Sequence, residues 1–246
     1  MEALRDAQGA LVDFDGTLVT AGALVPGAAE LMAAFGDRCV VVSNDAEHTP
    51  AELAADLAAL GIEVPAERIV LAGALAIEVV ARERPGAGVL LLASPALEDH
   101  ARRLGLDPDV ERPEVVIVGR DRRFSFARLA AAANAARGGA ALVVANPDRT
   151  HPGPGRGIVP ETGALASAIL TCTGPIPYRV IGKPEPALFL AGLAILGLEP
   201  AQAVMIGDNP ETDGLGAERV GMRFLLARDG RLPDTSARAP RLAGAA

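Results

Sequence analysis

The 246-residue sequence is poor in aromatic side chains, with no tryptophan, one tyrosine and six phenylalanines. Because half of the residues are nevertheless apolar, the core must be built from Ala, Leu, Val and Ile packed in regular elements. Only two cysteines occur: Cys39 within an apolar run and Cys172 at the end of a helical pattern. We expect two buried free thiols rather than a disulfide, which fits a reducing cytoplasm.

Long apolar runs and an excess of positive charge are also missing. No apolar run approaches membrane-spanning length, and residues 1–8 lack the apolar core of a signal peptide, so we expect a cytoplasmic protein without a membrane partner. The 23 Lys and Arg against 31 Asp and Glu give a net charge of −8, which repels a nucleic-acid backbone. The densest basic group, Arg120, Arg122 and Arg123, alternates with Asp121, so we interpret it as a solvated turn and expect no nucleic-acid partner.

The order of the predicted elements indicates an α/β fold. Short apolar runs alternate with amphipathic stretches, which is typical of βα units around a Rossmann-like parallel sheet. Residues of chemical interest lie before about residue 50 and after about residue 180. We therefore predict a discontinuous core of residues 1–79 and 179–246, with a second α/β domain inserted at residues 80–178. The predicted strands are Ala10–Phe14, Arg38–Ser43, Arg68–Leu71, Gly88–Ala93, Glu114–Gly119, Ala141–Ala145, Tyr178–Ile181, Ala203–Ile206 and Arg223–Ala227.

The strongest chemical signal directly follows the first of these strands. Asp13 and Asp15 are two residues apart, a spacing that sends both carboxylates to the same side of an extended chain. Two acids at the carboxyl end of a buried parallel strand repel each other unless a cation or a substrate group lies between them. Gly16 then permits a tight turn, and Thr17 offers a hydroxyl.

Three further polar loops follow predicted strands. They are Ser43-Asn44-Asp45, Gly182-Lys183-Pro184, and Gly207-Asp208-Asn209-Pro210-Glu211-Thr212-Asp213. Taken singly, each is compatible with an ordinary turn, a surface loop or a helix cap. Because the carboxyl ends of parallel strands meet at one edge of a sheet, we expect all four loops to lie close together.

In this order the four loops resemble the motifs of the haloacid dehalogenase-like superfamily of phosphohydrolases. Only 24 residues separate Leu18 from Ser43, too few for a cap domain, so the insertion must come later. The segments Gly119-Arg120-Asp121 and Ala145-Asn146-Pro147-Asp148 resemble the large α/β (C2-type) cap of the NagD-like and pyridoxal phosphatase-like branch. The resemblance implies a Mg²⁺-dependent phosphatase of small phosphorylated metabolites that works through an aspartyl-phosphate.

The resemblance also implies roles for individual residues. Asp13 is the expected nucleophile and Asp15 the general acid and base, while Ser43, Asn44 and Lys183 hold the phosphate. Mg²⁺ is expected on Asp13, the backbone carbonyl of Asp15, and Asp208, with Asp213 supporting its water shell. Recognition of the leaving group is expected from Asn146, Asp148 and His151 of the cap, through which a homodimer is possible. Asp45, an extra acid in the second loop, is expected to face solvent.

Two alternatives stay open at this point. A phosphomutase or other phosphotransferase of the same superfamily is possible, although such relatives usually carry their cap between the first two motifs. A catalytically silent protein that binds a phosphorylated ligand would use the same pocket without turnover. The substrate could belong to the nucleotides, the sugar phosphates, glycerol phosphate or pyridoxal phosphate.

Overall fold

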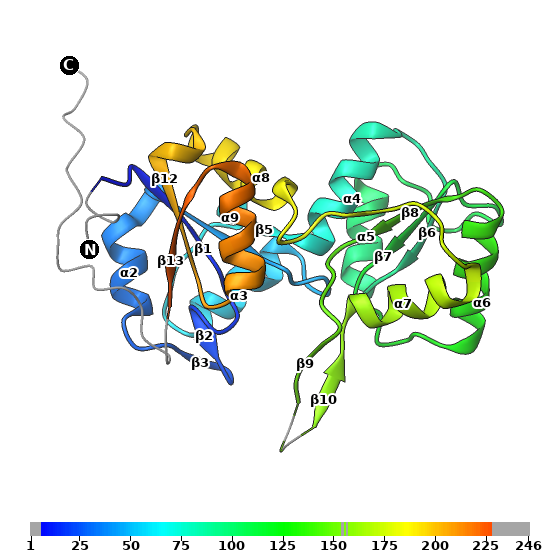
Figure 1. Cartoon of the computed structure of the whole chain (residues 1–246), viewed down its shortest axis with the longest axis horizontal. Coiled ribbons are helices and arrows are strands. Elements are labelled where there is room, and N and C mark those ends of the chain that lie inside the picture. Colours follow the sequence, from blue (N-terminus) through cyan, green and yellow to red (C-terminus); the bar gives the residue numbers. More distant parts are fainter. Residues whose placement is uncertain (1–5, 154, 156, 228–246) are drawn as a thin grey trace. The chain divides into compact units, whose positions relative to one another are not determined.

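The computed structural model describes residues 6–153, 155 and 157–227, which form two compact units (Figure 1). The first unit comprises the chain up to Ser43, Ala51–Val70, and the chain from Lys183 on. The second unit comprises Asn44–Pro50 and Leu71–Gly182. The prediction of an insertion at residues 80–178 therefore differs from the observed division at both ends, and it did not include the short segment Asn44–Pro50. Residues 228–246, which the prediction assigned to the core, lie outside the described residues.

The first unit contains a five-stranded sheet in the order β13-β12-β1-β4-β5. Strand β1 pairs in parallel with both β12 and β4, and β12 pairs in parallel with β13. The three central strands are buried along their whole length and are apolar apart from Ser43 at the end of β4, as expected of parallel strands covered on both faces. The strands are β1 (Gly9–Val12), β4 (Cys39–Ser43), β5 (Ile69–Leu71), β12 (Ala203–Gly207) and β13 (Arg223–Leu226).

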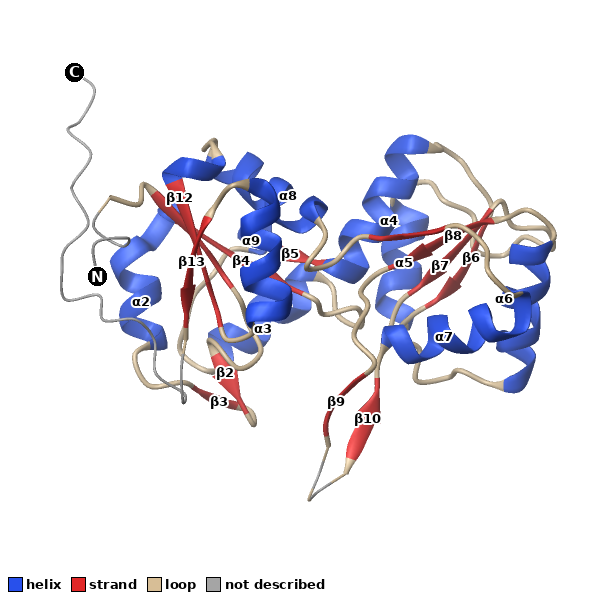
Figure 2. Ribbon diagram, viewed as in Figure 1, coloured by secondary structure: helices blue, strands red, loops and turns tan. Residues whose placement is uncertain are grey.

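Helices surround this sheet (Figure 2), and helix α8 packs against β1 and β4. The α-helices are α2 (Ala28–Phe35), α3 (Pro50–Ala59), α8 (Pro186–Leu196) and α9 (Leu215–Val220). Short 3₁₀ segments occur at η1 (Gly36–Arg38), η2 (Ala66–Arg68) and η3 (Pro200–Gln202), and η4 (Pro210–Gly214) is a π-helical turn. A small antiparallel hairpin, β2 (Val19–Thr20) and β3 (Ala23–Leu24), follows the first motif.

The second unit has its own four-stranded parallel sheet in the order β11-β8-β7-β6. Its core consists of apolar side chains from the sheet and from helices α6 and α7. The strands are β6 (Val89–Leu92), β7 (Val115–Val118), β8 (Ala141–Val144) and β11 (Tyr178–Val180). The helices are α4 (Ala72–Glu83), α5 (Pro95–Arg103), α6 (Phe126–Arg137) and α7 (Thr162–Thr173). A hairpin of β9 (Thr150–Pro152) and β10 (Ile158–Pro160) projects from this unit (Figure 1).

The α/β class with parallel sheets is confirmed, and each predicted strand occurs with ends shifted by at most two residues. The observed division differs from the predicted one at α4, which packs against α5 and belongs to the second unit. The prediction for Cys172 was wrong: Cys39 is buried, whereas Cys172 is exposed on α7. Within the described part of the chain, no helix is long and apolar enough to cross a membrane.

The turn after β7 is also less solvated than predicted. The Asp121 carboxylate is buried, and one of its oxygens lies 2.6 Å from Nε of Arg128. The backbone N–H of Arg123 donates to the other oxygen at 2.8 Å. Arg122 does lie at the surface, yet its Nε is 2.7 Å from a carboxylate oxygen of Glu47. The charged residues of this turn thus form ion pairs within the second unit and do not make a fully solvated loop.

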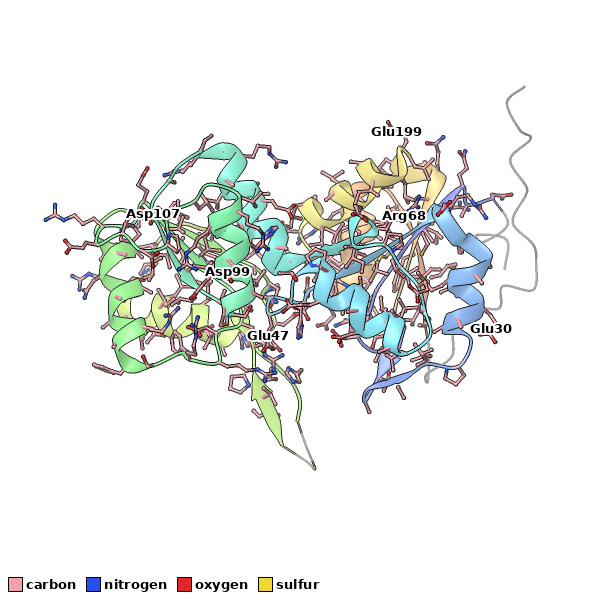
Figure 3. All side chains as sticks on the ribbon, turned by 180° about the vertical axis from the view of Figure 1, so that it is seen from behind. Glu30, Glu47, Arg68, Asp99, Asp107 and Glu199 are labelled. Atoms are coloured by element: carbon pink, nitrogen blue, oxygen red, sulfur yellow. The ribbon has the colours of Figure 1, made fainter. Side chains whose placement is uncertain are left out.

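The segment Asn44–Pro50 is integrated into the second unit by hydrogen bonds along its backbone. The carbonyl of Asp45 accepts from the N–H of Gly73 at 3.0 Å, and the carbonyl of Ala46 accepts from the N–H of Arg120 at 2.9 Å. Glu47, labelled in Figure 3, lies 3.1 Å from the Arg120 guanidinium through its carboxylate. These contacts explain why a segment that directly follows a core strand belongs to the other unit.

Asp45 is half-buried, so the prediction that it faces solvent was wrong. Its Oδ1 accepts from the backbone N–H groups of Glu47 and His48, both at 2.8 Å, and its Oδ2 lies 2.7 Å from Nδ1 of His48. Burial alone would raise the pKa of Asp45, but the hydrogen bonds and charge of His48 outweigh it and hold the pKa below its usual range. The extra acid of the second loop therefore organises its own turn.

Candidate functional site

The Asp13 carboxylate directly follows strand β1 and lies in the interior of the first unit. The backbone N–H of Asp13 donates to the carbonyl of Ile206 at 2.9 Å, which extends the ladder one residue past the strand. The residue is only 5% exposed. The Thr17 hydroxyl donates to Asp13 Oδ2 at 3.0 Å, and the Lys183 ammonium donates to Oδ1 at 2.5 Å. Both carboxylate oxygens are therefore held in fixed directions.

Lys183 links three parts of the first unit through a buried ammonium group. Besides Asp13, its Nζ lies 2.7 Å from Oδ1 of Asp213 and donates to the carbonyl of Val42 at 3.3 Å. Lys183 is the only lysine in the sequence; all other residues in the Lys and Arg count are arginines. Its uniqueness is a signal that the sequence analysis overlooked. A compact ammonium group fits between two buried carboxylates where a planar guanidinium would not.

The turn after β12 orients Asp213. The side chain of Asn209 accepts from the N–H of Glu211 at 2.9 Å, and the N–H of Asn209 donates to Asp213 Oδ2 at 3.1 Å. The Asp213 carboxylate lies against the backbone of Gly207, where a Cβ atom would overlap it. Glycine at this position is therefore required for Asp213 to reach Lys183. Asp208 lies at the start of the same turn and is exposed.

The electrostatics of this cluster are dominated by crowded negative charge. Burial raises the pKa of Asp13 above its usual range, with Lys183 opposing the shift and Asp213 and Asp15 adding to it. Burial and the charge of Asp213 likewise raise the pKa of Asp208. For Lys183, burial favours the neutral amine, but Asp13 and Asp213 outweigh it and raise the pKa. The site thus favours additional positive charge.

A hard divalent cation fits the donor atoms that are present. One carboxylate oxygen from each of Asp13, Asp208 and Asp213 lies within 4.8 Å of the others. An oxygen-only donor set of this kind suits Mg²⁺ or Ca²⁺ rather than a metal that prefers nitrogen or sulfur ligands.

The remaining residues of the first two motifs occupy different environments. Asp15 is exposed on the turn after Asp13 and is close enough to influence the Asp13 charge. Ser43 is the last residue of β4 and is buried, while Asn44 is half-buried and belongs to the second unit. The structure therefore brings Asp13, Lys183, Asp208 and Asp213 together, with Ser43 at the end of the strand next to β1.

The three predicted residues of the second unit differ in accessibility. Asn146 is buried and Asp148 is half-buried, and both are hydrogen-bonded to Asn44. His151 on β9 is half-exposed, and its Nδ1 lies 2.5 Å from Oε1 of Glu161. The same Glu161 oxygen lies 3.5 Å from the Arg120 guanidinium, a partner that the sequence analysis did not foresee. Direct contact of these three residues with a substrate stays a prediction.

Gly16 offers a test of the first motif. It has a φ of 79°, and a Cβ atom at this position would overlap the Asp208 carboxylate. Gly16→Ala should lower kcat/KM about 100-fold, because displacing a group of the site by about 1 Å has an effect of that size. Gly22→Ala is the matched control, since Gly22 has a φ of 77° but a Cβ atom there would meet nothing within 4 Å. Equal losses in both variants, measured by steady-state kinetics, would show that backbone strain alone is responsible.

Known sequences and structures resemble this chain over nearly its whole length. The family model described as haloacid dehalogenase-like hydrolase matches residues 10–107, and one described as HAD-hydrolase-like matches residues 180–245. The dihydroxyacetone phosphatase of Corynebacterium glutamicum (strain R) is 32% identical over 231 residues, which cover 93% of this chain and 83% of that protein.

Two solved structures extend the comparison. A glycerol phosphate phosphatase from Mycobacterium tuberculosis, in complex with magnesium, has a TM-score of 0.84 and 31% identity, covering 97% of this chain and 74% of that one. NagD from Escherichia coli K-12 has a TM-score of 0.82 and 28% identity, covering 93% of this chain and 92% of that one. The chain therefore belongs to the haloacid dehalogenase-like hydrolases and is a phosphoric monoester hydrolase of their NagD-like branch.

Proposed function

We propose that the protein hydrolyses small phosphomonoesters with the help of Mg²⁺ and through a phosphorylated Asp13. The observation that carries the proposal is the buried contact of Asp13 with Lys183, with Asp208 and Asp213 close by. A carboxylate can attack a negatively charged phosphate only where positive charge offsets both groups. The first unit supplies one such charge in Lys183 and a set of oxygen ligands for a second.

Asp13, Asp208 and the backbone carbonyl of Asp15 would hold the magnesium ion, with Asp213 near its water shell. When bound, the ion supplies the positive charge that lowers the repulsion between Asp13 and the phosphate. Lys183 and Ser43 would hold the non-bridging phosphate oxygens, with Asn44 beside them. With the phosphate held in this way, an Asp13 oxygen would attack phosphorus in line with the leaving oxygen.

The chemistry then proceeds in two steps. An Asp13 oxygen attacks phosphorus, the bond to the leaving oxygen breaks, and Asp15 donates a proton to that oxygen. In the second step Asp15 takes a proton from water, the water oxygen attacks phosphorus, and the bond to Asp13 breaks. The exposure of Asp15 suits this role, because the leaving group and the water both reach it from solvent.

The relatives described above point to small, polyhydroxylated substrates. Their names give dihydroxyacetone phosphatase and glycerol phosphate phosphatase activities. We propose a substrate of the sugar phosphate or glycerol phosphate class. His151 of the second unit stays our candidate for contacting its hydroxyl groups; its ring is half-exposed, and its Nδ1 lies 2.5 Å from Oε1 of Glu161. A homodimer through the second unit stays a prediction.

Hydrolysis of p-nitrophenyl phosphate and of a panel of phosphometabolites tests the proposal. We expect release of inorganic phosphate that depends on added Mg²⁺, is lost with a chelator and returns when Mg²⁺ is restored. Phosphoryl transfer between two positions of one sugar, with little free phosphate, would favour a phosphomutase. Tight binding of phosphorylated ligands without any turnover would favour the silent binding protein.

A further inference from the structure

Two polar side chains of the second unit hold the residue that follows Ser43. Nδ2 of Asn146 donates to the backbone carbonyl of Asn44 at 2.5 Å. Nδ2 of Asn44 donates in turn to Oδ2 of Asp148 at 2.9 Å. Both the main chain and the side chain of Asn44 are therefore fixed by the residues that follow β8.

The residue that precedes Lys183 is fixed at the same place. The N–H of Gly182 donates to the carbonyl of Ala145 at 2.7 Å. A Cβ atom on Gly182 would lie 2.5 Å from Oδ1 of Asn44 and 2.8 Å from the Ala145 carbonyl, so these three residues are in close contact. Residues Ala145–Asp148, which we call the anchoring turn, thus hold Asn44 and Gly182 side by side.

The internal bonds of the anchoring turn make it rigid. Oδ1 of Asn146 accepts from the N–H of Asp148 at 3.0 Å, and its Nδ2 also approaches the Thr162 hydroxyl at 3.4 Å. The Ala145 N–H donates to the Val118 carbonyl at 2.8 Å, which ties the turn to the sheet. Asn146 is only 1% exposed, and its amide group is hydrogen-bonded to these partners.

We propose that Asn146 and Asp148 are positioning residues that fix Ser43 and Lys183 through the adjoining peptides at Asn44 and Gly182. The inference rests on the proposed function, in which Ser43 and Lys183 hold the transferred phosphoryl group. That group is common to every substrate. The anchoring turn therefore affects the rate with all substrates equally, whereas a contact with the leaving group affects each substrate differently.

Kinetics of the full-length enzyme with Mg²⁺ separate the two roles. The variants are Asn146→Ala and Asp148→Ala, with the exposed residues Asn134→Ala and Asp99→Ala as matched controls from the same unit; Asp99 is labelled in Figure 3. We expect kcat/KM to fall about 10-fold to 100-fold, by a similar factor for p-nitrophenyl phosphate, glycerol phosphate and a hexose phosphate. Inhibition by inorganic phosphate, which has no leaving group, should weaken as well.

Asp148→Asn adds a rescue, because asparagine keeps an oxygen that can accept from Asn44 and should restore most of the rate. If Asn146→Ala does not fold, Asp148→Ala and its rescue by Asp148→Asn still test the positioning role. Asp148 is only half-buried, so we expect its variants to fold. Losses that differ more than about 10-fold between leaving groups (a difference of about 1.4 kcal/mol), with unchanged phosphate inhibition, would overturn the positioning role. Unchanged kinetics in Asp148→Ala would overturn it too. Wild-type enzyme that hydrolyses none of the three esters would instead contradict the proposed function itself.

Discussion

Asp13→Asn should abolish turnover while leaving the fold intact. The amide keeps the shape of the side chain and an acceptor oxygen for Thr17 or Lys183, but it cannot attack phosphorus. We expect kcat to fall by at least about 10⁴-fold, as in other enzymes that lose their nucleophile. Acid quenching of the working wild-type enzyme, followed by peptide mass spectrometry, should place a phosphate on Asp13, and the variant should carry none.

The matched control is Asp56→Asn, which replaces an exposed carboxylate of helix α3 in the same unit. We expect full activity from this variant. The free energy of unfolding of Asp13→Asn should stay within about 1 kcal/mol of the wild type, because the substitution also removes repulsion from Asp213. Substantial activity in a folded Asp13→Asn enzyme would contradict the assignment of the nucleophile.

Lys183→Met should lower both activity and stability. Removing the ammonium leaves the carboxylates of Asp13 and Asp213 buried without their cation. Breaking a buried ion pair in this way costs about 3–5 kcal/mol, which urea unfolding in the presence of a chelator would measure. We expect kcat to fall about 10²-fold to 10³-fold when Mg²⁺ is present, since a charge that stabilises the transition state is lost.

Two further variants serve as comparisons for Lys183→Met. Arg68→Met removes the cation of a surface ion pair with Asp37, 3.6 Å away, and should cost roughly 1 kcal/mol or less. Lys183→Arg keeps the charge but should not restore activity, because the guanidinium is too large and planar for the space between the two carboxylates. A Lys183→Met enzyme as stable as the wild type under these conditions would mean that the buried contact contributes nothing.

The sequence predicted the core of the first unit well, for a physical reason. Central parallel strands are continuous apolar runs, and polar residues that directly follow them must meet at one sheet edge. The loops after β1, β4 and β12 could therefore be assigned before their geometry was known. Lys183 followed from its loop motif, although its contact with Asp213 depends on the turn at Asn209.

The features that the sequence did not predict depend on contacts without a local pattern. The hairpins β2–β3 and β9–β10 have strands of two or three residues, too short for a visible alternation. From the sequence, Asp45 could be either solvated or hydrogen-bonded within its own turn. Only the structure shows that its carboxylate contacts the His48 ring. The segment Asn44–Pro50 continues from a core strand, and its partners Arg120 and Asn146 lie far away in the sequence.

The segment Asn44–Pro50 matters for the design of chimaeras in which the second unit is exchanged between relatives. The chain crosses from one unit to the other at four peptide bonds, after residues 43, 50, 70 and 182. A chimaera spliced at residues 80 and 178 would cut helix α4 and pair Asn44 with a foreign anchoring turn. A transplant of residues 71–182 should therefore carry residues 44–50 from the same donor protein.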